Sequence, residues 1–224
     1  MTNKLLMSEK KVFSQNGEDG IIEEILLRLN LKSGYFLEFG VQSGQECNCA
    51  YLAKDKGWLG TFIESDSNDY NLLKNNYINY NVNILNDFVT SENIQDIINS
   101  LKVEVDLLSI DIDSQDYWVW EAITSLPKVV VIEYNAALKG KKAIVKGRQK
   151  PWDGTTAYGA SLEAYIELGK RKGYTFIHTE SHGVNAFFVR NDFANLFPEK
   201  DNPIMVDRNV ANHPNTNEDV FVDV

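Results

Sequence analysis

Cysteine and histidine are scarce, with two cysteines and three histidines among 224 residues. Cys47 and Cys49 are separated by one residue, a spacing that supplies neither a structural zinc site nor a disulfide framework. We therefore expect two reduced thiols, which is typical of a cytoplasmic protein. The N-terminal segment lacks the apolar core and cleavage site of a signal peptide, and no apolar run approaches the ~20 residues that span a bilayer.

Positively charged residues are also few: the chain has 22 lysines and arginines and 32 aspartates and glutamates, which gives a net charge of −10. Such a chain repels the phosphates of nucleic acids unless it carries a local basic patch, so we expect no nucleic-acid partner. The 43% hydrophobic content is enough for one sizeable core, and no repeat or linker divides the chain. The sequence therefore predicts a single domain over residues 1–224 and leaves a homo-oligomer open.

What is present is a regular alternation of short apolar strands and amphipathic helices. The predicted strands cover residues 35–39, 58–64, 82–86, 105–111 and 128–134. The predicted helices lie within residues 12–30, 47–57, 67–77, 91–101 and 115–126. Runs such as VVVI and LLSI do not alternate with polar residues, which favours strands buried on both faces of a parallel sheet.

The pattern changes after the fifth strand. Residues 136–158 are predicted to form a long loop, residues 161–173 a helix, and the tail from Phe197 has no assigned structure. Two further strands, 174–180 and 184–190, are joined by the turn SHG, which is too short for a parallel crossover and requires antiparallel pairing. The predicted fold class is α/β: a doubly wound, Rossmann-like, seven-stranded sheet with helices on both faces and a C-terminal antiparallel strand.

Ligands of such sheets bind at the carboxyl ends of the strands, so the residues there form the candidate site. The first strand ends in EFGVQSG, in which Gly40 and Gly44 permit a tight turn and a close approach to a ligand. Gln42 stands where a dinucleotide fingerprint has its middle glycine. Glu38 would repel a pyrophosphate but suits a cationic ligand such as S-adenosylmethionine. An ordinary strand-to-helix turn is the alternative interpretation.

The next two strand ends carry polar residues that suit a nucleoside. Glu64 can accept hydrogen bonds from both ribose hydroxyls, while Asp66 is expected to cap the following helix. Asn86 and Asp87 can hydrogen-bond the exocyclic amine of adenine, with Phe88 beside the ring. Because Asn and Asp are also common turn residues, a plain turn is an equal alternative at this strand end.

Acidic residues follow the fourth and fifth strands, at Asp111, Asp113 and Glu133. Carboxylate oxygens at two neighbouring strand ends match a hard divalent cation such as Mg²⁺ or Mn²⁺. We therefore predict these three acids as metal ligands, and Asp113 also as a catalytic residue. A hydrogen-bonded polar network without a metal is the alternative.

Two features concern the acceptor of a reaction at this site. The loop from Lys139 to Lys150 carries several lysines and an arginine but no acid, which suits the docking of an anionic acceptor, with a merely solvated loop as the alternative. His182 lies in the turn between the last two strands and is a candidate general base, although a turn histidine is more often only solvent-exposed. His178 is expected to face a packing layer.

The ordered motifs LEFGVQSG, FIESD, LND, LLSIDID and VVVIEYN, preceded by FSQNGEDG, resemble the class I S-adenosylmethionine-dependent methyltransferases. Within that class the chain is similar to the FkbM-like and sugar O-methyltransferase branch, over about residues 13–190. A weaker resemblance is to methyltransferases of bacterial capsular polysaccharide pathways, including those for methyl phosphoramidate decoration.

The resemblance implies S-adenosylmethionine as the cofactor. The implied contacts run from its methionine half to its adenine in the order Glu38, Gly40, Gly44, Glu64, Asn86 and Asp87, with Gln15 also beside it. Asp111, at the end of the fourth strand, is a further predicted cofactor contact. The predicted function is O-methylation of a small anionic acceptor (a phosphorylated or nucleotide-linked sugar, or a phosphoramidate) in polysaccharide or capsule biosynthesis, assisted by a divalent metal. The alternatives are a nicotinamide-dependent oxidoreductase, which the missing glycine pattern disfavours, and a non-catalytic nucleoside-binding regulatory module.

Overall fold

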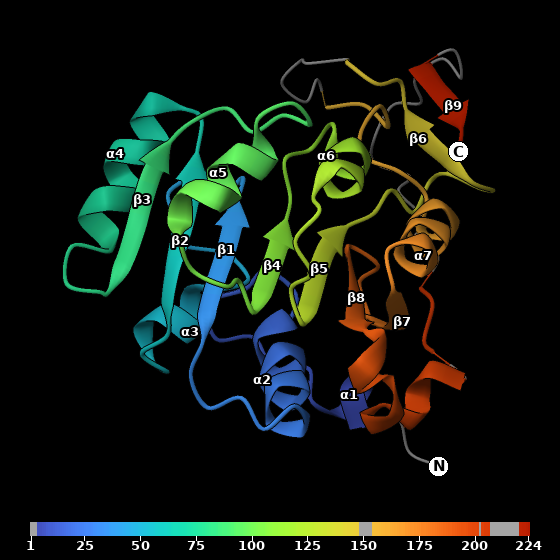
Figure 1. The fold of residues 1–224 in the computed structure, drawn as a ribbon, viewed down its shortest axis with the longest axis horizontal. Coiled ribbons are helices and arrows are strands. Elements are labelled where there is room, and N and C mark those ends of the chain that lie inside the picture. Colours follow the sequence, from blue (N-terminus) through green and yellow to red (C-terminus); the bar gives the residue numbers. More distant parts are fainter. Residues whose placement is uncertain (1–3, 148–153, 202, 207–219) are drawn as a thin grey trace.

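The computed structural model describes residues 4–147, 154–201, 203–206 and 220–224. Its main feature is a seven-stranded sheet in the order β3-β2-β1-β4-β5-β8-β7 (Figure 1). Its strands are β1 (Tyr35–Phe39), β2 (Leu59–Glu64), β3 (Val82–Asn86), β4 (Leu107–Ile110), β5 (Val129–Glu133), β7 (Tyr174–Thr179) and β8 (Asn185–Arg190). The predicted Rossmann-like sheet is confirmed, and each predicted strand is present.

The order of the strands places the switch point of the sheet at β1. This strand pairs in parallel with both β2 and β4. The chain adds β2 and β3 on one side of β1 and then crosses over to add β4 and β5 on the other side. Ligands of doubly wound sheets bind outside the carboxyl ends of the strands at such a point. β8 pairs antiparallel with both β5 and β7, as the short turn between β7 and β8 requires.

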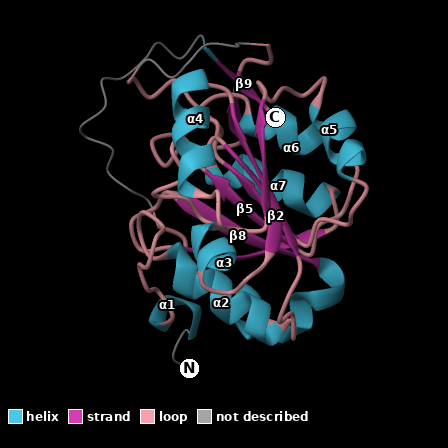
Figure 2. Cartoon of the chain, turned by 90° about the vertical axis from the view of Figure 1, so that its left-hand side faces the viewer, coloured by secondary structure: helices cyan, strands magenta, loops and turns pink. Residues whose placement is uncertain are grey.

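Helices cover both faces of the sheet, as Figure 2 shows. One face carries α1 (Lys4–Met7), α2 (Glu18–Arg28), α3 (Ala50–Lys54) and α4 (Ser67–Asn76); the other carries α5 (Ile94–Leu101), α6 (Asp116–Ala122) and α7 (Leu162–Arg171). The short helices η1 (Asn191–Leu196) and η2 (Pro198–Asp201) follow β8. The VVVI run of β5 is completely buried between the two helical layers, which is why it does not alternate with polar residues. Within the described residues, each helix is too short or too polar to cross a membrane.

α2 lies within residues 12–30, where a helix is predicted, and a turn precedes it. Asp19 Oδ2 accepts hydrogen bonds from the N–H groups of Val12, Phe13 and Ser14 at 2.7 to 2.8 Å. The same oxygen accepts the Ser14 hydroxyl at 2.8 Å. One buried carboxylate therefore organises the whole segment that leads into the helix.

The segment after β5 is not the structureless loop that its lysines and glycines predict. β6 (Lys142–Ile144) pairs antiparallel with β9 (Phe221–Asp223), which comes from the tail that had no assigned structure. The side chains of Trp118 and Gln115 donate to the carbonyls of Ile144 and Val145 at 2.7 and 3.1 Å. These bonds hold the β6–β9 pair against the start of α6.

Candidate active site

A cavity of about 210 Å³ lies at the carboxyl ends of β1, β2 and β4, beside the switch point of the sheet. Its lining is made of Phe39, Gly40, Gln42, Ile63, Glu64, Ser65, Asp87, Phe88, Val89, Asp111, Ile112, Asp113 and Ser114. Five predicted site residues, Gly40, Glu64, Asp87, Asp111 and Asp113, therefore meet in one place.

Gly40 brings the first and fourth strand ends into contact. Its φ is +80°, and a Cβ at this position would lie 1.5 Å from the carbonyl oxygen of Asp111. The turn after β1 thus runs directly against the backbone that follows β4. Only glycine permits both this conformation and this distance.

Glu64 is held at the cavity by backbone groups of two turns. Its Oε2 accepts the Gln42 N–H at 2.7 Å, and its Oε1 accepts the Asp66 N–H at 2.8 Å. The side chain is buried, so these two bonds fix the orientation of the carboxylate. Each carboxylate oxygen has a second lone pair, which leaves room for a ligand hydroxyl. Asp66 caps α4 by accepting the N–H groups of Asn68 and Asp69, as predicted.

Glu38 lies outside the cavity lining, so its contact with a cofactor stays a prediction. Its Oε1 and Oε2 accept the N–H groups of Asn48 and Cys49, each at 2.8 Å, and Ser109 Oγ donates to Oε1 at 3.1 Å. Burial raises the pKa of the Glu38 carboxyl, and the hydrogen bonds oppose this rise. The carboxylate therefore fastens the loop that leads to α3. Cys47 and Cys49 in that loop form no disulfide, as predicted, and both are buried.

Three further predicted cofactor residues also lie outside the cavity lining. Gly44 faces α4, where a Cβ would lie 2.4 Å from Leu73 Cδ1. Asn86 Nδ2 donates to the carbonyl of Glu64 at 2.7 Å and so holds the turn after β2. Gln15 is exposed in the segment before α2. Gly44 and Asn86 thus shape the turns around the cavity, and contacts of all three with a cofactor stay predictions.

Asp87 and Phe88 line the cavity at the end of β3. Asp87 Oδ1 accepts the Phe88 N–H at 2.8 Å, which orients both residues. The Phe88 side chain is 47% exposed, unlike the aromatic residues of the core. An exposed ring beside a cavity offers a flat apolar surface for a planar ligand.

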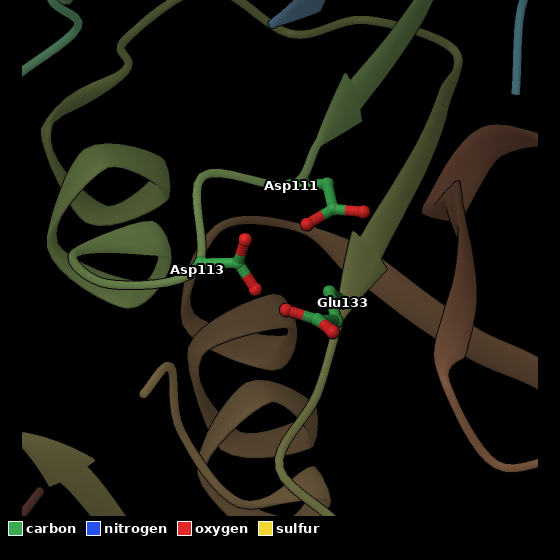
Figure 3. Close-up of side chains that lie close together, drawn as sticks. All are labelled: Asp111, Asp113 and Glu133. Carbon is green, nitrogen blue, oxygen red and sulfur yellow. The ribbon is translucent and has the colours of Figure 1, made fainter. Parts of the chain in front are cut away.

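Asp111, Asp113 and Glu133 converge at the ends of β4 and β5, and Figure 3 shows their carboxylates facing one another. One oxygen of each lies within 4.8 Å of the others. The register explains the proximity, because Ile110 pairs with Ile132 and the two strands end together. The predicted clustering of these acids is confirmed.

Asp113 reaches this cluster from a left-handed backbone, with a φ of +56°. Asp116 holds that backbone, since its buried carboxylate accepts the N–H groups of Ile112 and Ser114 at 2.8 and 2.9 Å. Burial raises the pKa of Asp116 to about 6, against the lowering effect of these hydrogen bonds. A non-glycine residue in this conformation costs on the order of 1–3 kcal/mol and persists only where its surroundings hold it.

The three clustered acids have raised pKa values. Burial is the largest cause for Asp111 and Glu133, followed by the charges of neighbouring carboxylates, and burial also raises the pKa of Asp113. Glu133 Oε2 is buried and has no hydrogen-bond partner among the described residues. Ionised carboxylates in this setting require a cation or a proton. The donor set fits a hard divalent cation, which prefers oxygen ligands.

His182 lies in the β7–β8 turn and outside the cavity lining. Its side chain is 57% exposed, and its Nδ1 is 3.5 Å from Glu180 Oε2. Catalysis by His182 stays a prediction. His178 is fully buried, and burial lowers its pKa to about 4, which agrees with its predicted place in a packing layer.

The lysines of the loop after β5 have partners of their own. Lys141 Nζ lies 3.2 Å from Glu167 Oε2, and Lys146 Nζ lies 5.4 Å from the centroid of the Trp118 ring. Arg148 and Lys150 of the predicted basic loop lie outside the described residues. The docking of an anion by this loop stays a prediction.

A second cavity, of about 150 Å³, begins one residue after Glu133. Its lining includes Tyr134 and Asn135 from the end of β5, Lys139 from the basic loop and Leu162 from α7.

No family model matches this sequence, and no curated protein matches it either. Solved structures match its fold. The N-terminal domain of EvdMO1, solved in the presence of SAH and D-fucose, is 10% identical with a TM-score of 0.51, over 77% of this chain and 82% of that chain. An S-adenosylmethionine-dependent methyltransferase from Clostridium acetobutylicum is 9% identical, with a TM-score of 0.49. The match covers 85% of this chain and 92% of that chain. The CurJ carbon methyltransferase is 12% identical, with a TM-score of 0.47. The match covers 76% of this chain and 52% of that chain, so this chain spans about half the length of the CurJ structure. The chain thus shares the Rossmann-like fold of the EvdMO1 domain.

Proposed function

We propose that this protein is an S-adenosylmethionine-dependent methyltransferase that transfers a methyl group to an oxygen of a small acceptor. The observation that carries the proposal is the cavity at the switch point, where Gly40, Glu64 and Asp87 meet the acids after β4. Sheets of this architecture bind nucleoside ligands at that point. The EvdMO1 domain, which shares the fold, was solved in the presence of SAH, and this supports the same cofactor here.

Glu64 is the residue that we assign to the ribose. Its carboxylate is already oriented by two backbone N–H groups, so it can accept ribose hydroxyls in charge-assisted hydrogen bonds without reorganising. Asp87 and Phe88 are assigned to the adenine, and Asp111 to the amino group of the methionine half. The acidic lining favours a cationic cofactor and disfavours the pyrophosphate of a nicotinamide dinucleotide.

When bound, S-adenosylmethionine supplies an electrophilic methyl group on a sulfonium. The chain's main contribution is to align the acceptor with that methyl group, because an in-line displacement gains most from orientation. Asp113 lines the cavity and belongs to the acid cluster, so we assign it to the proton of the acceptor hydroxyl. A divalent cation held by Asp111, Asp113 and Glu133 would lower the pKa of that hydroxyl.

The acceptor that we infer is a sugar with an anionic group, such as a phosphate, a nucleotide or a phosphoramidate. The presence of D-fucose with the EvdMO1 domain supports a sugar, and Lys139 at the second cavity supports the anionic group. A place in polysaccharide or capsule biosynthesis depends on the resemblance of the sequence motifs.

Isothermal titration calorimetry with SAH, with NADH as the comparison ligand, tests the proposal. We expect SAH to bind and NADH to give no heat. Binding of NADH without SAH would establish the nicotinamide alternative. If SAH binds but no methyl group reaches any member of a panel of free, phosphorylated and nucleotide-linked sugars, the non-catalytic alternative is favoured.

A further inference from the structure

We infer that Asn185, the first residue of β8, is a further ligand of the cation site formed by Asp111, Asp113 and Glu133, and that Glu18 positions it. This inference rests on the metal-assisted function proposed above. It adds to the site an amide oxygen from the antiparallel hairpin, whereas the three acids come from the ends of parallel strands.

The register of β5 and β8 brings Asn185 to this site. Asn185 is the direct partner of Glu133 in the antiparallel ladder. The Tyr134 N–H donates to the Val184 carbonyl at 2.9 Å, which makes the Glu133–Asn185 pair a non-hydrogen-bonded pair. Side chains of such a pair lie on the same face of the sheet and at their closest separation. The Asn185 amide therefore emerges beside the Glu133 carboxylate.

Glu18 determines which end of the amide is free. Asn185 Nδ2 donates to Glu18 Oε1 at 2.9 Å. An ionised carboxylate only accepts hydrogen bonds, so the amide nitrogen must face it and the amide oxygen must face away. Glu18 is itself fully buried, and its Oε2 accepts the Asn16 N–H at 2.7 Å. The orientation of the Asn185 oxygen is thus fixed by a residue at the start of α2.

The two facing residues share an unusual feature, since both have a buried oxygen without a hydrogen-bond partner among the described residues. These atoms are Asn185 Oδ1 and Glu133 Oε2. The Asn185 side chain is only 3% exposed. Buried acceptors without partners are rare in folded proteins because each costs desolvation free energy. A single cation between them would satisfy both.

The charge around the pair favours a cation over a neutral donor. Asp111, Asp113 and Glu133 each place one carboxylate oxygen within 4.8 Å of the others at this end of β4 and β5. Mg²⁺ and Mn²⁺ accept carboxylate and amide oxygens together. A neutral amide oxygen adds a ligand to the coordination shell of the cation and does not increase the repulsion among the acids.

Titration of the full chain with Mn²⁺, followed by the electron paramagnetic resonance signal of the free ion, tests this inference. Asn185→Ala should weaken Mn²⁺ binding by about tenfold or more, as expected for the loss of a ligand. Its affinity for SAH, measured by calorimetry, should stay within about twofold, since Asn185 does not line the first cavity. Asn48→Ala is the matched control, because Asn48 is a buried asparagine whose Nδ2 donates to Ser109 Oγ at 3.1 Å. This control should leave Mn²⁺ affinity unchanged.

The double variant Glu18→Gln/Asn185→Asp separates ligation from packing, because it exchanges the amide and the carboxylate between the two positions. The hydrogen bond between the residues is kept, and an oxygen still faces the acid cluster. Mn²⁺ affinity should therefore return to within about threefold of the wild type. Asn185→Leu, which fills a similar volume without an oxygen, should bind Mn²⁺ as weakly as Asn185→Ala.

The outcomes are distinguishable. Unchanged Mn²⁺ affinity in folded Asn185→Ala, or weak affinity in the folded double variant, overturns the role of Asn185. A wild-type protein that binds SAH but no Mn²⁺ overturns this inference together with the metal, and leaves methyl transfer standing. A protein that binds Mn²⁺ with the expected ranking of variants but no SAH supports the cation site and counts against the proposed function.

Discussion

The backbone N–H of Gln42 donates to the Glu64 carboxylate at 2.7 Å and so connects the turn after β1 with the end of β2. Gln42 has a left-handed φ of +50°. Because the bond comes from the main chain, a residue with a side chain can stand where a dinucleotide site has a glycine. The two segments assigned to the methionine half and the ribose of the cofactor are therefore joined before any ligand arrives.

Glu64→Gln should weaken SAH binding by about 1–3 kcal/mol, because a charge-assisted acceptor becomes a neutral amide. Calorimetry with SAH measures the change. Asp66→Asn is the control, since asparagine caps a helix as well as aspartate does and removes one charge two residues away. Equal losses in both variants would mean that net charge, and not contact with Glu64, controls binding.

Gly40→Ala should destabilise the fold far more than Gly57→Ala. Both glycines have positive φ, +80° and +66°, but a Cβ at Gly57 meets nothing within 4 Å, whereas one at Gly40 collides with the Asp111 carbonyl. We expect a loss of about 1 kcal/mol at Gly57 and at least about 3 kcal/mol at Gly40 in the free energy of unfolding. Urea denaturation measures both, and similar losses would contradict the close approach of the two strand ends.

Glu38→Gln should lower the free energy of unfolding by about 1–3 kcal/mol, since one buried N–H at the start of α3 loses its acceptor. SAH affinity should fall less than in Glu64→Gln. Glu46→Gln is the control, because the Glu46–Lys11 ion pair at 3.0 Å is exposed and such pairs contribute little. A loss of SAH affinity in Glu38→Gln that exceeds that of Glu64→Gln would support direct contact of Glu38 with the cofactor.

Stabilisation by Mn²⁺ should be larger at about pH 8 than at about pH 5. The folded pKa values of Asp111, Asp113 and Glu133 are raised, so the folded state holds more protons than the unfolded state above pH ~4. The contribution of these acids to stability is therefore greatest at low pH and is lost as the pH rises through their folded pKa values, unless a cation binds. Thermal unfolding with Mn²⁺ or with EDTA measures this, and Asp113→Asn should reduce the difference. If Mn²⁺ raises the melting temperature by the same amount at both pH values, the acids are not its ligands.

The sequence was sufficient for the sheet because its strands are short apolar runs with turn residues at their ends. It was not sufficient for β6 and β9, which are three-residue strands that exist only by pairing across a long stretch of chain. Residues 136–158 and the tail carry no period that could have revealed this pairing.

Within the site, the sequence located the strand ends but not the direction of each side chain. Glu38 pairs in register with Phe62, whereas Glu64 lies two residues further along β2. The Glu38 carboxylate is therefore one layer deeper in the sheet, where the backbone before α3 surrounds it. Asn185 escaped notice because its place opposite Glu133 depends on the register of β8 against β5, two strands that lie far apart in the sequence.

The buried thiols of Cys47 and Cys49 make the loop before α3 an intrinsic reporter of local opening. Burial raises the pKa of both well above the usual value for a thiol, so neither solvent access nor thiolate is available in the closed state. An alkylating reagent can react only during excursions in which this loop separates from β1, and its rate then measures how often they occur. A ligand that bridges the neighbouring strand ends will slow alkylation of the two thiols. The rate of alkylation therefore reports how much of the ligand site is occupied, without any label on the protein.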